Sequence, residues 1–278
     1  MFRGIWWSTN FLLILAVLGL IYTAGWEYST RRYLDGFSDA IVPDSESPER
    51  QVLAILDWMR NGPPRPVAPD PSALPTRDPQ TTLNYRELLS VCGTGTNAFL
   101  NLARSNGLRA RRLLLLSPER TAKHVVAEVL IDGRWVVADP AYHVLLRDAG
   151  GHLLTRSELR DPLVFAQATG AIPNYSKEYS YESVAHVRLA RLPMEGFHLR
   201  QLLDRVSPNW EEAADWSLLL ERESFFALCV AMVTTVFFLL VRILLGWSAD
   251  KHLKIQRFRL RAQFHRAGSA FFHVPEIK

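Results

Sequence analysis

Cysteine is scarce in this sequence. Two cysteines occur among 278 residues, and one of them, Cys229, lies inside an apolar stretch near the C-terminus. Cys92 therefore has no partner for an internal disulfide, and no CxxC or HxxxH pair suggests a zinc site. An unpaired thiol in a folded domain is either buried and inert or retained for its reactivity. Cys92 is thus the first candidate for chemistry, with burial in a core as the alternative.

Other absences argue against nucleic-acid binding, repeat architectures and cofactor chemistry. Lysine and arginine together number 32 against 28 acidic residues, but no basic stripe is interleaved with aromatic residues, so no nucleic-acid partner is expected. The chain has no internal repeat and no low-complexity block apart from residues 64–79, where six prolines predict an extended linker or a wrapped loop. No motif indicates a metal or a cofactor, so neither is expected.

Two long apolar stretches are present, at residues 5–26 and 225–247. Each is close to the roughly 20 residues that a helix needs to cross a bilayer. A cleaved signal peptide is the alternative for the first, but its apolar run is long and Thr23-Ala24-Gly25 is a poor cleavage site. A core helix is the alternative for the second, whose continuous apolar length favours a span. We therefore expect two transmembrane helices.

The basic C-terminal tail, residues 248–278, sets the expected orientation. Clusters of lysine and arginine beside a span stay on the cytoplasmic side, and this one contains Lys251, Lys254, Arg257, Arg259, Arg261 and Arg266. With two spans, residues 1–4 are also cytoplasmic and the central region is extracytoplasmic. The prediction is a two-pass protein of the cell (inner) membrane with a periplasmic domain, and with membrane lipids as partners of its spans and tail.

The central region of roughly 195 residues is long enough to bury one core. Residues 27–80 are expected to form a connector, a helix and the proline-rich linker, with Ser47 capping the helix and Pro48 at its first position. Residues 81–207 are expected to form the folded extracytoplasmic domain. A juxtamembrane helix over residues 208–224 then leads into the second span.

A helix and a hairpin dominate the predicted domain. The helix runs from Cys92 to Asn106, and Gly107 is suited to the left-handed conformation at its end. A strand follows over residues 108–116. Asp132-Gly133 lies between two β-rich segments, residues 124–131 and 134–139, and this dipeptide between apolar runs is a strong hairpin signal.

The hairpin register places two polar residues on one face. If Asp132 and Gly133 are the two loop residues, Asp139 lies opposite Val126, and His124 is two residues further along the same strand. Side chains alternate between faces, so His124 and Asp139 project to one side as diagonal neighbours roughly 7–8 Å apart. A slip of one residue would put them on opposite faces. The spacing therefore predicts a hydrogen bond between the carboxylate and the imidazole.

Cys92 at a helix N-terminus completes a plausible nucleophilic site. The unpaired N–H groups and the helix dipole favour the thiolate, and the same N–H groups can hold an oxyanion. Gly93 and Gly95 leave the first turn without bulk, so that a substrate backbone can approach. A neutral His124 would accept the thiol proton, and Asp139 would orient the ring.

These segments resemble the core of the transglutaminase-like superfamily over roughly residues 88–142. The similarity rests on Val91-Cys92 and the helix after it, on the run from His124 to Val129, and on the run from Gly133 to Pro140. It implies an α+β, papain-like core, in which the Cys helix packs on an antiparallel sheet, with Cys92, His124 and Asp139 as the catalytic triad. Substrate contacts are expected at Gly93, Gly95 and Trp135.

The sequence also departs from that family. Members often carry an aromatic residue soon after the histidine, where this chain has Val125 and Val126. Nothing resembles the calcium sites or additional β-domains of the large animal cross-linking enzymes. Because bacterial relatives include proteases and deamidases, the resemblance implies cleavage of amide bonds as readily as cross-linking.

The expected function is that of a membrane-anchored thiol enzyme that acts on amide bonds through a thioester, by hydrolysis, deamidation or acyl transfer. A protein or peptide substrate is implied. The alternative is a non-catalytic binding or scaffold module of a membrane-bound envelope assembly, since a fold can be kept without its activity. A metal site at Cys92, His124 and Asp139 is the third possibility, with little support from the spacing of the ligands.

Overall fold

The computed structural model describes residues 2–43, 46–67, 70, 74–186, 205–206, 219 and 221–253. It divides into two compact units. One comprises Met1–Tyr22 together with Cys229–Lys278, and the other is Thr23–Leu228. The first contains most of the two apolar stretches, and the second contains all three residues of the predicted triad.

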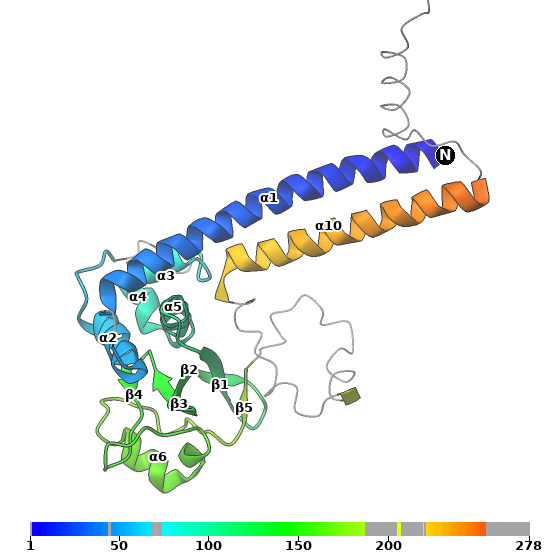
Figure 1. Ribbon diagram of the computed structural model, residues 1–278. Helices are drawn as coiled ribbons and strands as arrows, with labels where there is room; N and C mark the ends of the chain where they lie inside the picture. The colour runs from blue at the N-terminus through cyan, green and yellow to red at the C-terminus, as the bar shows by residue number, and fades with distance from the viewer. Residues whose placement is uncertain are drawn as a thin grey trace, which may run out of the picture. The chain divides into compact units, whose positions relative to one another are not determined.

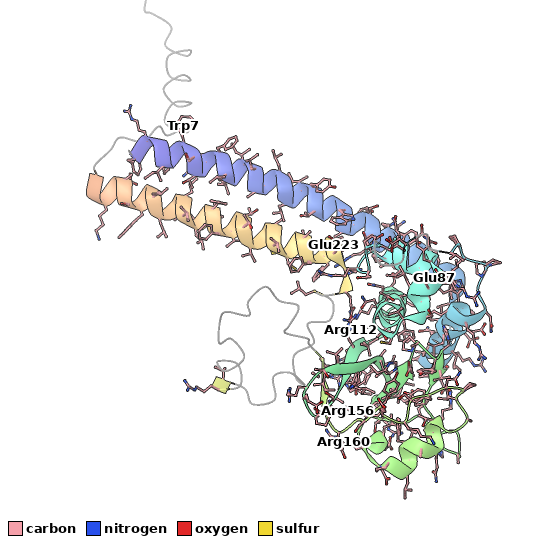
Figure 2. All side chains as sticks on the ribbon, turned by 180° about the vertical axis from the view of Figure 1, so that it is seen from behind. Trp7, Glu87, Arg112, Arg156, Arg160 and Glu223 are labelled. Atoms are coloured by element: carbon pink, nitrogen blue, oxygen red, sulfur yellow. The ribbon has the colours of Figure 1, made fainter. Side chains whose placement is uncertain are left out.

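Two long helices run through the first unit. They are α1 (Phe2–Ile41) and α10 (Glu223–Ser248), and a short π-helical turn, η4 (Ala249–Leu253), follows α10. Both are long and apolar enough to cross a membrane, and almost none of their most apolar windows is buried. Their side chains project outward along the helices (Figure 2), while the Arg242 guanidinium lies 4.3 Å from the Trp6 ring. The predicted spans fall within these helices. Most of the predicted juxtamembrane helix and basic tail lies outside the described residues.

The second unit has a mixed α+β fold (Figure 1). Its sheet has five strands in the order β4-β3-β2-β1-β5, and every pair of neighbours is antiparallel. The strands are β1 (Ala110–Leu116), β2 (Ala122–Ile131), β3 (Arg134–Asp139), β4 (Val144–Leu145) and β5 (Val184–Ala185). The helices are α2 (Pro48–Asn61), α3 (Pro79–Asn84), α4 (Arg86–Ser90), α5 (Cys92–Ser105), η2 (Glu158–Arg160) and α6 (Pro162–Thr169).

The central hairpin has the register that the sequence predicts. β2 and β3 pair from Ile131↔Arg134 to Ala127↔Ala138. Asp132 and Gly133 form the turn with φ of 49° and 79°, so both adopt the left-handed conformation that matches the twist of a two-residue hairpin. Because the register is fixed, Asp139 ends β3 beside the first half of β2.

The core on one face of the sheet lies under α5. Its buried residues include Phe99 and Leu102 of α5, Val129 of β2 and Val136 of β3. The core also takes in Leu34 of α1 and four residues of α2, namely Val52, Ile55, Leu56 and Met59. The folded unit thus begins well before residue 81, the boundary expected from sequence. The reason is that residues 27–41 continue α1 and bring apolar side chains, about one turn apart, against α5.

The opposite face of the sheet carries a second apolar cluster. It joins Leu113, Val126 and Val137 to Leu159 of η2 and to Phe165 of α6. The chain returns to the sheet at β5, which pairs with β1 at the edge of the sheet. The segment between α6 and β5 carries three tyrosines, Tyr175, Tyr179 and Tyr181, across the end of the sheet where Asp139 lies.

Candidate active site

The thiol of Cys92 stands at the first residue of α5, as the sequence predicts. Val91, which precedes it, makes no side-chain cap, so the first-turn N–H groups of α5 remain for the thiol or for a ligand. Thr96, one turn further on, donates from its hydroxyl to the carbonyl of Val125 at 3.0 Å. That bond ties the start of α5 to β2 beside His124. Cys92 itself is half-buried, so a substrate can reach it.

His124 and Asp139 are directly hydrogen-bonded. The imidazole Nε2 lies 2.7 Å from Asp139 Oδ2, and the two side chains are 2% and 0% exposed. The other carboxylate oxygen of Asp139 accepts from the backbone N–H of Ala141 at 3.1 Å. With Nε2 engaged by the carboxylate, Nδ1 is the ring nitrogen left for the sulfur. The structure therefore brings the three predicted residues together.

Contacts within this group shift two pKa values in opposite directions. Hydrogen bonding to His124 lowers the pKa of Cys92, against the raising effect of burial, and the N–H groups of Val125 and Gly93 lower it further. Burial alone would lower the pKa of His124, but the hydrogen bonds and charges of Asp139 and Cys92 outweigh it and raise the value to about 9. These directions favour a thiolate beside an imidazolium.

Three tyrosines that the sequence analysis did not identify surround the imidazole. The ring of Tyr179 is stacked on His124, with centroids 4.2 Å apart and planes 1° from parallel. The hydroxyl of Tyr175 donates to Asp139 Oδ2 at 2.9 Å, and the ring of Tyr142 packs on that of Tyr175 at 4.5 Å. For two of them the available signal was composition, because Tyr175 and Tyr179 belong to a group of three tyrosines within residues 175–181.

The two glycines of the first turn have different surroundings. A Cβ on Gly95 would lie 2.5 Å from the carbonyl oxygen of Leu89, so its missing side chain allows α5 to pack against α4. A Cβ on Gly93 would meet nothing within 4 Å. Of the two, Gly93 is the one with open space beside Cys92, and substrate contact at both positions stays a prediction.

Trp135 lies at the other end of β3 from Asp139. Asp139 lies four positions further along the chain, or roughly 13 Å along an extended strand. Its ring contacts Arg111, whose guanidinium carbon is 4.1 Å from the ring centroid, and it lines a cavity of about 330 Å³ with Arg104, Leu108, Arg109, Ala110 and Arg111. A direct contact between Trp135 and a substrate at Cys92 would need an extended substrate, and this role also stays a prediction.

The part of the chain that the structure describes contains no group of three His, Cys, Asp or Glu side chains arranged to hold a metal ion. Nor does the donor set at Cys92 suggest one. Both Nε2 of His124 and the carboxylate of Asp139 are already used in hydrogen bonds to each other and to neighbouring groups. What the arrangement offers chemically is a nucleophile, a base and an orienting carboxylate.

The chain was compared with protein families, with curated proteins and with solved structures. Residues 35–140 match the family described as the transglutaminase-like superfamily. A crystal structure of a candidate cysteine protease from Cytophaga hutchinsonii is similar at 21% sequence identity and a TM-score of 0.31, over 45% of this chain and 40% of that one. This chain therefore spans less than half of that protein. No curated protein matches the chain.

Proposed function

We propose, from the transglutaminase-like domain that residues 35–140 of this chain carry, that the protein is a membrane-anchored thiol enzyme acting on amide bonds. The observation that carries the proposal is the direct 2.7 Å contact of His124 with buried Asp139, next to a thiol whose pKa that histidine lowers. A buried carboxylate that orients an imidazole beside a thiol is the arrangement required for nucleophilic acyl transfer.

In the first step the Cys92 thiolate attacks the carbonyl carbon of an amide. The developing oxyanion receives hydrogen bonds from first-turn N–H groups of α5, which point toward negative charge at a helix N-terminus. The C–N bond then breaks as His124 gives the proton on Nδ1 to the departing nitrogen. The products of this step are a free amine and a thioester on Cys92.

In the second step His124, now neutral, takes a proton from an incoming nucleophile. Water gives the carboxylic acid and regenerates the thiol, so that the net reaction is hydrolysis or deamidation. An amine gives a new amide, and the net reaction is transfer. Asp139 keeps its charge throughout and stabilises each imidazolium. A protein or peptide substrate fits this chemistry best, because its amides supply the carbonyl carbon under attack.

The two apolar helices support the membrane part of the proposal. Almost none of their most apolar windows is buried within the described chain, which favours lipid contact over a soluble core. With the basic tail in the cytoplasm, the domain faces the periplasm. A reporter enzyme that works only in the cytoplasm should be active when fused after Lys278, and one that works only outside the cytoplasm should be inactive there. An extracytoplasmic signal there would reverse the orientation.

The pH dependence of Cys92 alkylation tests the proposed chemistry. In a Cys229→Ala background, which leaves one thiol, we expect iodoacetamide to label Cys92 with a half-maximal rate at a pH well below 9.0, the ordinary value for a thiol. His124→Ala should move that midpoint upward, because it removes the hydrogen bond that lowers the pKa. A thiol that reacts in the ordinary pH range, or not at all in the folded protein, would favour the non-catalytic module.

A trapping experiment would identify the substrate. Cys92→Ala keeps His124 and Asp139 but cannot form the thioester, so bound substrate should be retained and not processed. We expect peptides or proteins captured by this variant to be cleaved, deamidated or coupled by the wild-type protein. The alternative scaffold function predicts equal capture by both proteins and no change in the captured molecule.

A further inference from the structure

Tyr175 occupies an unusual position in the candidate site. Its hydroxyl donates to Oδ2 of Asp139, the same oxygen that accepts from His124 Nε2. Residue 175 lies beyond the 35–140 segment that matches the superfamily, and it reaches the site through the segment that links α6 to β5. The resemblance therefore assigns it no role.

The structure assigns Tyr175 the role of a positioning residue that limits how strongly Asp139 holds the proton of the His124 imidazolium. This inference rests on the proposed function. The physical reason is competition for one oxygen. Each donor withdraws part of the negative charge from Oδ2, so with Tyr175 bound the carboxylate attracts the imidazolium proton less strongly. An imidazolium that is held less tightly gives its Nδ1 proton more readily to a leaving amine.

The surroundings keep the Tyr175 hydroxyl in this position. Its ring lies between those of Tyr142, at 4.5 Å, and Phe165, at 6.0 Å. Burial, with the nearby Tyr181 and Asp139, raises its pKa, so the hydroxyl keeps its proton and remains a donor across the working range of pH. The N–H of Ala141 occupies Oδ1, which prevents the carboxylate from turning that oxygen toward the histidine.

Tyr179 restricts the orientation of the His124 ring. Its ring lies flat on one face of the imidazole, so His124 can meet Asp139 and Cys92 only through its edge. The ring cannot tilt to compensate for a lost bond at Oδ2. A change at the Tyr175 hydroxyl should therefore appear as a change in the acidity of the imidazolium and not as a new orientation of the ring.

The test is a pH titration of His124 in the full chain in detergent. The ¹⁵N chemical shifts of the imidazole ring report its protonation, and the signals that disappear in His124→Ala identify it. Wild type should titrate near 9, as its raised pKa indicates. Tyr175→Phe keeps the ring and removes only the hydroxyl, and we expect the titration to move upward by about one pH unit. Tyr33→Phe is the matched control, because it also removes one tyrosine hydroxyl, and that hydroxyl accepts from the Asn84 side chain on α3 and not from a group of the triad. Its titration should match wild type.

The outcomes separate this inference from the proposed function. A wild-type histidine that titrates near or below 6.5 would contradict the proposed ion pair itself. A wild type that titrates near 9, with Tyr175→Phe unchanged or shifted downward, would overturn only the role of Tyr175. If Tyr175→Phe does not fold, as judged by its thermal unfolding, Tyr175→Met fills the same space without a hydroxyl and should give the same upward shift. An upward shift that Tyr33→Phe shares would also overturn the inference.

Discussion

At the scale of single residues, the site depends on a carboxylate that is fully removed from solvent. Asp139 is 0% exposed, and it accepts hydrogen bonds from His124, Tyr175 and the backbone of Ala141. A buried negative charge is costly without such partners. Here the partners also define its task, because one of them is the ring that must face the Cys92 sulfur.

Asp139→Asn should therefore disable the site with little change in its shape. Burial would still lower the pKa of His124, while the carboxylate charge that helps to raise it to about 9 would be gone and an amide NH2 group would replace Oδ2, the oxygen that accepts from the ring. The pKa of His124 should fall, the imidazolium should be lost at lower pH, and Cys92 should ionise only at higher pH. We expect turnover to drop by about 10³–10⁴-fold, because His124 would also no longer be held in the tautomer that can accept the thiol proton. Turnover and the pH profile of alkylation measure both effects.

The chain provides a control for this substitution. Asp148 and His152 form a second Asp–His pair, with Oδ2 and Nδ1 3.1 Å apart, on the exposed surface. Asp148→Asn should leave turnover and the alkylation profile unchanged, because exposed pairs of this kind contribute little. Wild-type turnover in Asp139→Asn would contradict the role proposed for that carboxylate.

At the scale of elements, α5 is positioned by close contact at its first turn. α4 ends at Ser90, and α5 starts two residues later, so the two helices meet where Gly95 faces the carbonyl of Leu89. The hydroxyl of Thr94 also donates to the carbonyl of Leu88. These contacts fix the N-terminus of α5, and with it the position of the Cys92 sulfur.

Gly95→Ala and Gly93→Ala form a matched pair of substitutions. Alanine in place of glycine usually stabilises a helix by about 0.5–1 kcal/mol. At position 95 the Cβ would lie 2.5 Å from a backbone oxygen, and we expect a net loss of about 1–3 kcal/mol. At position 93 the Cβ has open space, so we expect the usual gain. Chemical denaturation measures both, and equal effects at the two positions would contradict the packing role of Gly95.

The elements that the sequence predicted well are those with local signals. The Asp132-Gly133 turn, the Ser47 cap of α2 and the end of α5 near Gly107 each depend on a few adjacent residues. The two-residue strand β4 has no such signal, because it is too short to show an alternating pattern of apolar and polar residues. Tyr175 and Tyr179 also have no local signal, since they reach His124 and Asp139 only through the fold. The helical continuation of α1 was a missed signal, since Leu34, Phe37 and Ile41 recur at helical spacing.

At the scale of the folded unit, the far end of α5 is held as firmly as its first turn. Arg104 pairs with Glu221, which is fully buried just before α10, and it donates to the carbonyl of Ala110 at 2.9 Å. Ser38 of α1 donates to the carbonyl of Leu102 at 3.3 Å. The helix that carries the nucleophile is thus fixed by residues next to both apolar helices, so the anchoring segments also support the site.

A buried ion cluster joins these two segments, and it allows a direct test. Glu27 of α1 is 3% exposed and pairs with Arg222 at 2.9 Å and with Ser224 at 2.8 Å. Glu27→Gln would leave the buried charge of Arg222 without this partner, and we expect a loss of about 3–5 kcal/mol. Arg31→Gln removes the exposed partner of the same carboxylate and should cost only about 0.3–0.5 kcal/mol. Thermal unfolding of the full chain in detergent compares the two. Similar small losses would show that the cluster does not hold the start of α10 to α1.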